Sequence, residues 1–425
     1  MHVVIIGNGI TGVTAAREIR KAQPGWRITM ISSESEVHWS RPALMYVYMG
    51  HMRQADTQPY EPHFWVRNRI DLLRAHVVGI DTGAHVVELG DGARLAYDKL
   101  LVATGSQPNR FGWPGQDLAR VQGMYSLQDL EQLEQNSVGL SQAVIVGGGL
   151  IGIEMAEMLH SRGVHVVLLV REQSYWSNAL PPEESALVTD VIRAERGIDL
   201  RLGTELTEIV GNDRGEACAV ITSAGDRLEC QLVGLTAGVS PNLGAVRSSE
   251  IAVGRGVLVD EFLKTSAPDV WAAGDCAEVV PADGSRSWLQ QVWYTGRLQA
   301  KAAAANICGS DRPYQKGIWF NSAKFFDVEW QTYGLVSTKP SADETHLYWE
   351  AADRRKCMRL VFDAQGAFVA MNVIGIRYRH LVCEGWIRDG LRAPEVLQRL
   401  PEGNFDPEFS KRHEAEIAAT MKSQL

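Results

Sequence analysis

The sequence has few cysteines and no closely spaced pair of them. Six cysteines are scattered over 425 residues, and the nearest two, Cys218 and Cys230, are 12 residues apart. A redox dithiol or a zinc site of the C-x-x-C type needs a much closer pair, so this spacing excludes both. We therefore expect reduced and mostly buried thiols, and no metal site.

Long hydrophobic runs and an excess of positive charge are also missing. No stretch holds the roughly 18 consecutive apolar residues that cross a bilayer, and the N-terminus has no basic segment followed by an apolar core. The formal net charge is −9, whereas nucleic acids and anionic membranes attract basic surfaces. The sequence predicts a cytoplasmic protein without a membrane span or a nucleic-acid partner. Its length predicts two or three domains, since a single core rarely serves so long a chain.

A glycine-rich segment follows the first apolar run. Residues 3–6 are apolar and lead into Gly7, Gly9 and Gly12, which have the spacing G-x-G-x-x-G. In a dinucleotide-binding unit the first glycine permits a tight turn and the second lets the backbone approach a pyrophosphate. The third allows the next helix to pack on the strand, and the start of that helix favours phosphate. The pattern predicts a strand, a turn and a helix over residues 13–22.

The following segment completes this first unit. Residues 27–31 are predicted to form a second strand, and Glu34 comes 22 residues after Gly12. A carboxylate near this distance usually binds the ribose of the dinucleotide. Arg41 and Pro42 lie in the long connection beyond it, and such connections often cover a ligand. Arg41 is interpreted either as a partner for a phosphate or a flavin edge, or as an ordinary surface arginine.

A second glycine-rich segment has the same spacing. Gly147, Gly149 and Gly152 follow another apolar run, 140 residues after the first motif. A helix over residues 153–161 and a strand over residues 165–170 are predicted to follow. Two such units imply two dinucleotides.

Three further apolar strands are predicted to end at a glycine. They run over residues 100–103, 232–237 and 270–273, and are followed by Thr104-Gly105, Gly238 and Gly274-Asp275. A strand that stops at glycine indicates the close approach of a ligand or of another backbone segment.

The last third of the chain differs in composition. A helix is predicted over residues 288–307, and aromatic residues become frequent beyond residue 311. Strands are predicted there over residues 345–350, 357–362 and 367–374, with a helix over residues 379–388 and a charged helical tail. The aromatic residues are interpreted either as a dimer or partner surface, or as the core of a domain. They include Trp319, Phe320, Phe325, Phe326 and Trp330.

Together these motifs resemble those of the FAD-dependent pyridine nucleotide-disulfide oxidoreductase superfamily. The resemblance covers about residues 1–310 and rests on both glycine motifs, Ala103-Thr104-Gly105, Ala237-Gly238-Val239-Ser240-Pro241-Asn242 and Ala273-Gly274-Asp275. It implies an α/β fold with two Rossmann-like dinucleotide-binding domains, for FAD and NAD(P)H, and a C-terminal α+β domain. The implied boundaries are residues 1–115 and 245–310 for FAD, 116–244 for NAD(P)H, and 311–425 for a C-terminal interface domain.

The resemblance also implies roles for individual residues. The residues implied for FAD are Gly7, Gly9, Gly12, Glu34, Arg41, Pro42, Ala103, Thr104, Gly105, Gly274 and Asp275, with Gly238 as a further cofactor-binding residue. The residues implied for NAD(P)H are Gly147, Gly149, Ile151, Gly152 and Arg171. Glu154 would lie at the nicotinamide side and act in catalysis.

One segment narrows the resemblance to a branch of the superfamily. Ser40-Arg41-Pro42-Ala43-Leu44 is similar to a segment of rubredoxin and ferredoxin reductases, NADH oxidases and the flavin part of nitrite reductase. Residues 38–49 contain no cysteine, which disfavours disulfide chemistry at that position. Met45-Tyr46 stand where reductases for iron–sulfur partners often have serine and lysine.

The function that this branch implies is that of an FAD-dependent oxidoreductase. It would take hydride from NAD(P)H and pass electrons to a rubredoxin- or ferredoxin-type protein or to a small-molecule acceptor, without a redox-active dithiol. The alternatives are an NAD(P)H oxidase, a quinone reductase, and a regulatory protein that binds flavin and nucleotide. A homodimer is expected.

The choice between NADH and NADPH depends on the end of the second strand of the second unit. That strand ends at Val170, where NAD-specific units usually have an acid. An apolar residue removes the repulsion of a 2′-phosphate, and Arg171 is able to bind it by paired hydrogen bonds. These two residues favour NADPH. Ser177 stands where glutathione reductases that use NADPH have a second basic residue, and Glu172 would favour NADH by turning to the ribose.

Overall fold

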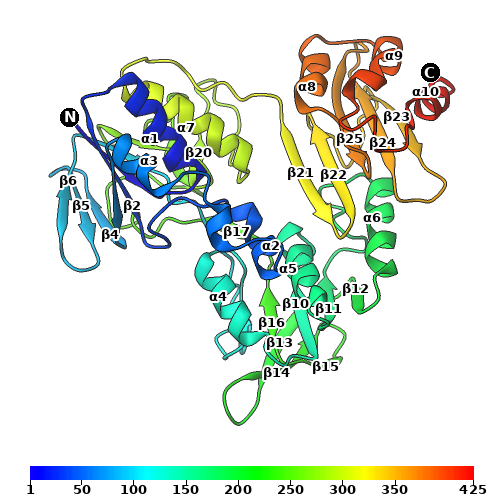
Figure 1. The fold of residues 1–425 in the computed structure, drawn as a ribbon, viewed down its shortest axis with the longest axis horizontal. Helices are drawn as coiled ribbons and strands as arrows, with labels where there is room; N and C mark the ends of the chain where they lie inside the picture. Colours follow the sequence, from blue (N-terminus) through cyan, green and yellow to red (C-terminus); the bar gives the residue numbers. More distant parts are fainter. The chain divides into compact units, whose positions relative to one another are not determined.

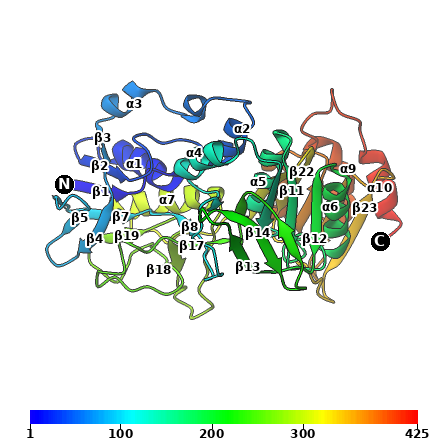
Figure 2. The same ribbon diagram turned by 90° about the horizontal axis from the view of Figure 1, so that it is seen from below.

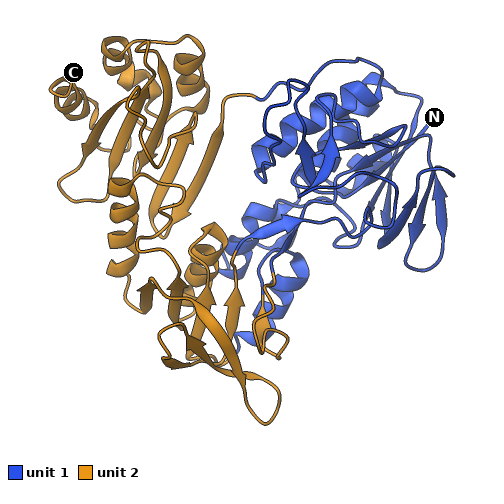
Figure 3. Ribbon diagram, turned by 180° about the vertical axis from the view of Figure 1, so that it is seen from behind, with its two compact units in different colours: residues 1–109, 123–138, 238–316 blue, residues 110–122, 139–237, 317–425 orange.

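The computed structural model describes residues 1–425 and consists of two compact units, which Figure 3 colours separately. Unit 1 comprises residues 1–109, 123–138 and 238–316. Unit 2 comprises residues 110–122, 139–237 and 317–425. Each unit is assembled from three stretches of chain, so contacts between residues far apart in sequence hold it together.

Unit 1 is built on a parallel sheet. Its strand order is β19 (Val270–Ala272), β7 (Lys99–Val102), β1 (His2–Ile6), β2 (Arg27–Ser32) and β3 (Ile70–Arg74). The central strands are buried and consist of continuous apolar runs, as expected for parallel strands. Helices α1 (Ile10–Ala22) and α7 (Trp293–Ile307) pack side by side (Figure 2). Small buried alanines of α7 allow this close contact.

Shorter elements complete unit 1. The helical ones are η1 (Arg41–Ala43), α2 (Leu44–Tyr48), η2 (Gln54–Thr57), α3 (Pro62–Arg67) and α4 (Leu127–Asn136). The strands are β4 (Val77–Asp81), β5 (Val86–Leu89), β6 (Arg94–Ala96), β8 (Ser106–Pro108), β17 (Val239–Pro241), β18 (Val257–Val259) and β20 (Ala277–Val279). Helix α4 begins with a capping box, because the hydroxyl of Ser126 accepts from the N–H of Asp129 and the Asp129 carboxylate accepts from the N–H of Ser126.

Unit 2 contains a second parallel sheet. Its order is β12 (Ile198–Leu202), β11 (His165–Val170), β10 (Gln142–Val146), β16 (Val233–Leu235) and β9 (Val121–Gln122). Helices α5 (Leu150–Ser161) and α6 (Pro182–Ala194) belong to this part. A small antiparallel sheet of β13 (Leu206–Gly211), β14 (Ala217–Thr222) and β15 (Arg227–Glu229) follows.

The C-terminal part of unit 2 has an antiparallel sheet. Its order is β21 (Phe320–Phe325), β22 (Val328–Tyr333), β25 (Phe368–Ile374), β24 (Cys357–Phe362) and β23 (Thr345–Glu350). Helices α8 (His380–Arg388) and α9 (Ala393–Gly403) lie beside one another near β22 and β25, and α10 (Glu414–Lys422) packs on β23 (Figure 1). The predicted class is confirmed: two Rossmann-like parallel sheets and a C-terminal α+β part.

One predicted helix begins later than expected. The helix predicted over residues 288–307 starts at Trp293, because the backbone of Trp288 exchanges two hydrogen bonds with Val279 and is therefore extended. The sequence prediction also missed β3, α6 and β12, whose half-polar patterns lack a clear period. None of the helices combines the length and the apolar character that crossing a membrane requires.

The aromatic residues beyond residue 311 mostly fill the core. Phe320, Phe325, Phe326 and Trp330 are buried, and among the five named above only Trp319 is partly exposed. These four side chains are core residues of unit 2, and Phe325 and Trp330 contact the ring of Trp176, which follows β11. A partner surface on this part of the chain would therefore use other residues.

A buried polar network joins α6 to the C-terminal sheet. The carboxylate of Glu184 is fully buried and accepts hydrogen bonds from Nε of Arg359 at 2.7 Å and from Nδ2 of Asn372 at 2.6 Å. Glu183 accepts from Nη2 of the same arginine at 2.7 Å. Burial raises the pKa of Glu184, while Arg359 and Asn372 act against this rise. Both oxygens of Glu184 are satisfied, whereas Oδ1 of Asn372 is buried without a hydrogen-bond partner.

We predict that Arg359→Met destabilises the protein by about 3–5 kcal/mol, because it leaves the Glu184 carboxylate buried without a cation. Urea titration followed by circular dichroism measures this change. The matched control is Arg354→Ala, which removes an arginine that is 55% exposed and pairs with Asp190 at 3.1 Å; that surface pair is worth about 1 kcal/mol or less. Equal losses in the two variants would contradict the importance of the buried network.

Candidate functional site

The first glycine loop connects β1 to α1 in unit 1. Gly7 has φ +114°, and a Cβ there would stand 2.1 Å from the carbonyl oxygen of Ala103. A Cβ on Gly12 would stand 2.0 Å from the oxygen of Gly7. A Cβ on Gly9, in contrast, would meet no atom within 4 Å. The packing of the chain thus requires the outer two glycines, whereas the middle one leaves space at the start of α1.

The second glycine loop, between β10 and α5 in unit 2, has the same construction. Gly147 has φ +129°, and a Cβ there would lie 2.6 Å from the carbonyl oxygen of Thr236. A Cβ on Gly152 would lie 2.2 Å from the oxygen of Gly147, and one on Gly149 would meet nothing within 4 Å. Both loops therefore leave room where a helix presents unpaired N–H groups, and a pyrophosphate fits this space and charge.

Glu34 and Arg41 were predicted separately and lie together in the structure. Nη2 of Arg41 is 2.6 Å from Oε2 of Glu34, and a second bond makes the pair bidentate. The backbone N–H of Leu127, the first residue of α4, also donates to Glu34 at 3.0 Å. The guanidinium of Arg41 lies over the rings of Trp39 and Tyr125, at 4.9 and 4.4 Å from their centroids. Arg41, which Pro42 follows in η1, is thus a partly buried, stacked residue and not an ordinary surface arginine.

Asp275 lies beside the first glycine loop. Gly274, with φ +82°, would place a Cβ 2.4 Å from the hydroxyl of Thr11 in α1, so this turn packs directly on the helix start. The hydroxyl of Ser106 donates to the Asp275 carboxylate at 3.2 Å. Burial raises the pKa of Asp275, while Ser106 and Arg41 act to lower it. The net pKa shift of Asp275 is upward, because burial is the largest of these effects.

The remaining predicted residues of unit 1 support this region. The carbonyl of Ala103 contacts the first glycine of the loop, and the hydroxyl of Thr104 donates to the Asn242 carbonyl at 2.7 Å. Gly105 and Gly238 both have positive φ, at +70° and +85°. Their turns bring β8 and β17 together as an antiparallel pair.

Three residues near Asp275 were missed by the sequence prediction. The N–H of Ser106 donates to the hydroxyl of Tyr125 at 3.0 Å, and Nε2 of Gln291 donates to the hydroxyl of Ser106 at 2.7 Å. Ser106, Tyr125 and Gln291 come from separate stretches of chain and belong to no recognisable motif. Only the fold brings them to one place.

Glu154 lies on α5, two residues after the last glycine of the second loop. Burial and then the charge of Glu157 raise the pKa of Glu154 to about 7. Tyr175, which is fully buried, donates its hydroxyl to the carbonyl of Gly149 at 2.8 Å. Ile151 stands on the first turn of the same helix. Glu154 therefore stands on the second turn of the helix that begins at the middle glycine of the loop.

The end of β11 carries Val170 and Arg171. Val170 is fully buried under the second loop, where a Cβ on Gly148 would come within 2.6 Å of its methyl carbon. The side chain of Arg171 is 71% exposed and pairs with Glu172 at 3.0 Å. Glu172 therefore already balances the charge of Arg171.

The six cysteines are free thiols. Cys276, which follows Asp275, is fully buried, and burial raises the pKa of its thiol. Its sulfur lies 3.4 Å from the carbonyl oxygen of Ala273. This geometry is that of a small core residue.

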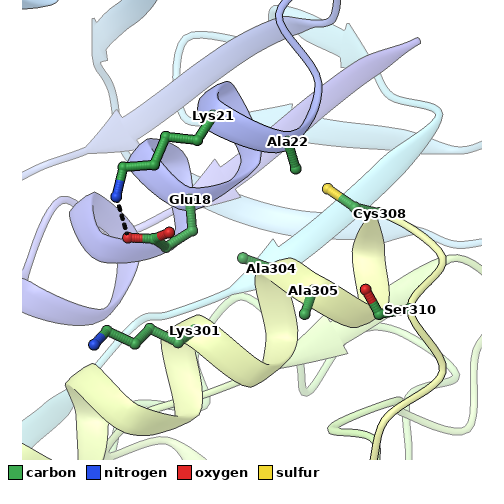
Figure 4. A pocket seen from close by; sticks show the side chains of 8 residues that line it. All are labelled: Glu18, Lys21, Ala22, Lys301, Ala304, Ala305, Cys308 and Ser310. Atoms are coloured by element: carbon green, nitrogen blue, oxygen red, sulfur yellow. Dashed lines mark hydrogen bonds and ion pairs between the residues drawn. The ribbon is translucent and has the colours of Figure 1, made fainter.

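A separate cavity lies at the far end of α1 (Figure 4). Its volume is about 460 Å³, and it is lined by Glu18, Lys21, Ala22, Lys301, Ala304, Ala305, Cys308 and Ser310. A helix rises about 1.5 Å per residue, so Lys21 lies roughly 17 Å along the axis from Ile10. Lys21 pairs with Glu18 at 2.8 Å. This cavity is therefore distinct from the glycine loop at the other end of the helix.

Comparisons with known proteins agree with this geometry. The chain is 30% identical over 396 residues to the ferredoxin reductase subunit of a 5,5′-dehydrodivanillate O-demethylase from Sphingobium, covering 92% of this chain and 93% of that protein. It is 29% identical over 315 residues to a rubredoxin-NAD(+) reductase from Pseudomonas putida, covering 74% and 81%. Among solved structures, a covalent complex of putidaredoxin reductase with putidaredoxin has the same fold, with a TM-score of 0.82, 23% identity and 99% coverage of both chains.

A family model described as pyridine nucleotide-disulphide oxidoreductase matches residues 1–303. The match includes both glycine loops, Glu154 and Asp275. The chain therefore belongs to the pyridine nucleotide-disulphide oxidoreductase family and is an FAD-dependent oxidoreductase that uses NAD(P)H.

Proposed function

We propose that this protein is a reductase that takes hydride from NAD(P)H onto FAD and passes electrons to a small iron–sulfur or rubredoxin-type protein. The observation that carries the proposal is the pair of glycine loops, each with space at its middle glycine and a helix start behind it. Two relatives named as reductases of a ferredoxin system and of rubredoxin support the choice of acceptor. The same electron transfer from FAD would also serve a small-molecule acceptor.

Unit 1 carries the residues that would hold FAD. The open space at Gly9 would admit the pyrophosphate, and the start of α1 would face it with its N–H groups. Glu34, held by Arg41, is available for the ribose, and Asp275 for a further hydroxyl or phosphate group. A bound flavin would accept hydride and release electrons singly, which a nicotinamide cannot do.

Unit 2 carries the residues that would hold NAD(P)H. The space at Gly149 would admit the second pyrophosphate, and Tyr175 supports this loop from behind. Glu154 would lie at the nicotinamide, where an ionised carboxylate stabilises the positive charge that develops as hydride leaves. We propose that the FAD-binding domain comprises residues 1–115 and 245–310 and that the NAD(P)H-binding domain comprises residues 116–244. Residues 311–425 would form the C-terminal domain, which contributes a homodimer or partner surface.

NADH is the coenzyme that the names of the relatives favour, since one of them specifies NAD(+). The preference for NADPH that we predict from Val170 and Arg171 gains no support from them. Val170 nevertheless leaves no acid at the end of β11, and Arg171 is exposed beside it. We infer that Arg171 allows NADPH to bind in addition to NADH.

The function is tested by comparing two matched glycine variants. We predict that the purified protein retains FAD and that NAD(P)H bleaches it anaerobically in a stopped-flow experiment. Gly9→Val should fold but lose FAD, whereas Gly149→Val should keep FAD and lose its reduction by NAD(P)H, because each side chain fills one open space and strains no other contact. Turnover with rubredoxin, ferredoxin, quinone and oxygen then identifies the acceptor. A wild-type protein whose FAD is not bleached would refute the proposal.

A separate experiment tests whether Arg171 binds the 2′-phosphate of NADPH. We predict that Arg171→Ala lowers kcat/KM for NADPH by about ten- to a hundredfold, the loss of a charge-assisted hydrogen bond, and leaves NADH use level. Arg201→Ala on the neighbouring strand β12 removes another exposed arginine and serves as the control. An unchanged ratio of the two coenzymes would exclude Arg171 from phosphate binding.

The raised pKa of Glu154 predicts a pH dependence. Its carboxyl is protonated below about pH 7 and ionised above it, and the ionised form is the one that stabilises positive charge on the nicotinamide. The rate of flavin reduction should therefore rise as pH rises through about 7. Glu154→Gln should remove this rise and be slower at high pH. A rise of the same size in the glutamine variant would assign the titration to another group.

A further inference from the structure

We propose that Lys324 is a positioning residue for the nicotinamide site: by pairing with Glu157 it keeps that carboxylate ionised, and Glu154 thereby becomes the carboxyl that gains and loses a proton. The inference rests on the proposed function, which places Glu154 at the nicotinamide. It assigns a role in the reductive step to a residue of the C-terminal sheet, outside both glycine motifs.

The contact that carries the proposal lies within unit 2. Strand β21 packs on α5, and Nζ of Lys324 is 2.7 Å from Oε1 of Glu157. Glu157 is only 7% exposed, and its other oxygen, Oε2, is buried without a hydrogen-bond partner. A buried carboxylate with one satisfied oxygen needs a nearby cation to stay ionised. Lys324 supplies that cation.

Helix geometry connects this ion pair to Glu154. Glu154 and Glu157 are three residues apart on α5 and therefore lie on the same side of the helix. Like charges at this spacing repel, and the charge of Glu157 contributes, after burial, to the raised pKa of Glu154. The lysine thus acts on Glu154 through Glu157.

The charge balance of the cluster supports the same assignment. The titratable and charged groups that these contacts bring to this side of α5 include Glu154, Glu157 and His160 of the helix, Tyr175 of the loop after β11 and Lys324. Tyr175 is neutral, because burial raises its pKa above the ordinary value. His160 contacts the ring of Phe326 at 6.2 Å between centroids. Two carboxyl groups and one ammonium group have no net charge when one of the carboxyl groups is protonated. Because Glu157 is paired with Lys324, Glu154 is the carboxyl that binds this proton.

The experiment measures the titration of Glu154 directly. The FAD-bound protein without nucleotide is labelled with [¹³Cδ]glutamate, and the carboxyl signal of Glu154 is assigned by its loss in Glu154→Gln. We expect a midpoint near pH 7 in the wild type. Glu157→Gln replaces the charged neighbour by a neutral one of the same shape, and should lower this midpoint by on the order of one pH unit.

Lys324→Met should move the Glu154 midpoint in the same direction. Without its cation the charge of the buried Glu157 is strongly destabilised, so the repulsion that this charge exerts on the carboxylate of Glu154 is lost. Lys324→Arg retains the cation and should stay near the wild type. Lys339→Met, in the exposed loop between β22 and β23, is the matched control and should change nothing. The double variant Lys324→Met/Glu157→Gln should match Glu157→Gln alone.

Each other outcome overturns a defined part of the proposal. An unchanged midpoint in Glu157→Gln and Lys324→Met excludes the coupling, and a midpoint that rises in Lys324→Met shows that the lysine acts on Glu154 directly. The pH profile of flavin reduction should follow the shifted midpoints. If the Glu154 midpoints shift but the pH profile of flavin reduction does not, the coupling of the charges holds, and Glu154 has no role at the nicotinamide. A flavin that NAD(P)H does not bleach at any pH would refute the proposed function itself.

Discussion

Close backbone contact at the ends of parallel strands is the constraint on which the rest of the structure depends. In unit 1 the first glycine of the loop lies against the carbonyl of Ala103, and the third lies against the first. In unit 2 the same contacts recur, with Thr236 in place of Ala103. A side chain at any of these four glycines would force the strand and the helix apart. The middle glycines are under no such constraint, and this difference marks the space left for a ligand.

The charged groups around the two loops are arranged differently. In unit 1, Glu34 and Arg41 neutralise each other and fix one another's position, while Asp275 is held by Ser106. This arrangement suits tight binding of a cofactor, because the side chains are ordered in advance. In unit 2, Glu154 stands on the helix after the loop, and burial and then the charge of Glu157 raise its pKa to about 7. This arrangement suits a step in which charge changes.

The C-terminal sheet belongs structurally to the same unit as the second loop. It contributes Lys324 to α5 and Arg359 and Asn372 to α6. In both contacts the partner is a buried carboxylate on a helix of the Rossmann-like part, Glu157 on α5 and Glu184 on α6. Aromatic side chains of the same sheet add apolar contacts, since Phe325 and Trp330 contact the ring of Trp176 at 5.5 and 4.9 Å between centroids.

The sequence by itself determined the two dinucleotide units, because a G-x-G-x-x-G spacing, an apolar strand before it and a helical pattern after it are all local. It also predicted strands β23 and β24 to the residue and indicated Asp275 from a strand that ends at glycine. The extended backbone at Trp288, which delays α7, depends on a pairing with Val279 that no local pattern reveals. The same holds for the Glu34–Arg41 pair, for Ser106, Tyr125 and Gln291 around Asp275, and for Lys324 beside Glu157. Only the tertiary structure decided these contacts, because a side chain finds its electrostatic partner through the folding of distant segments and not through spacing along the chain.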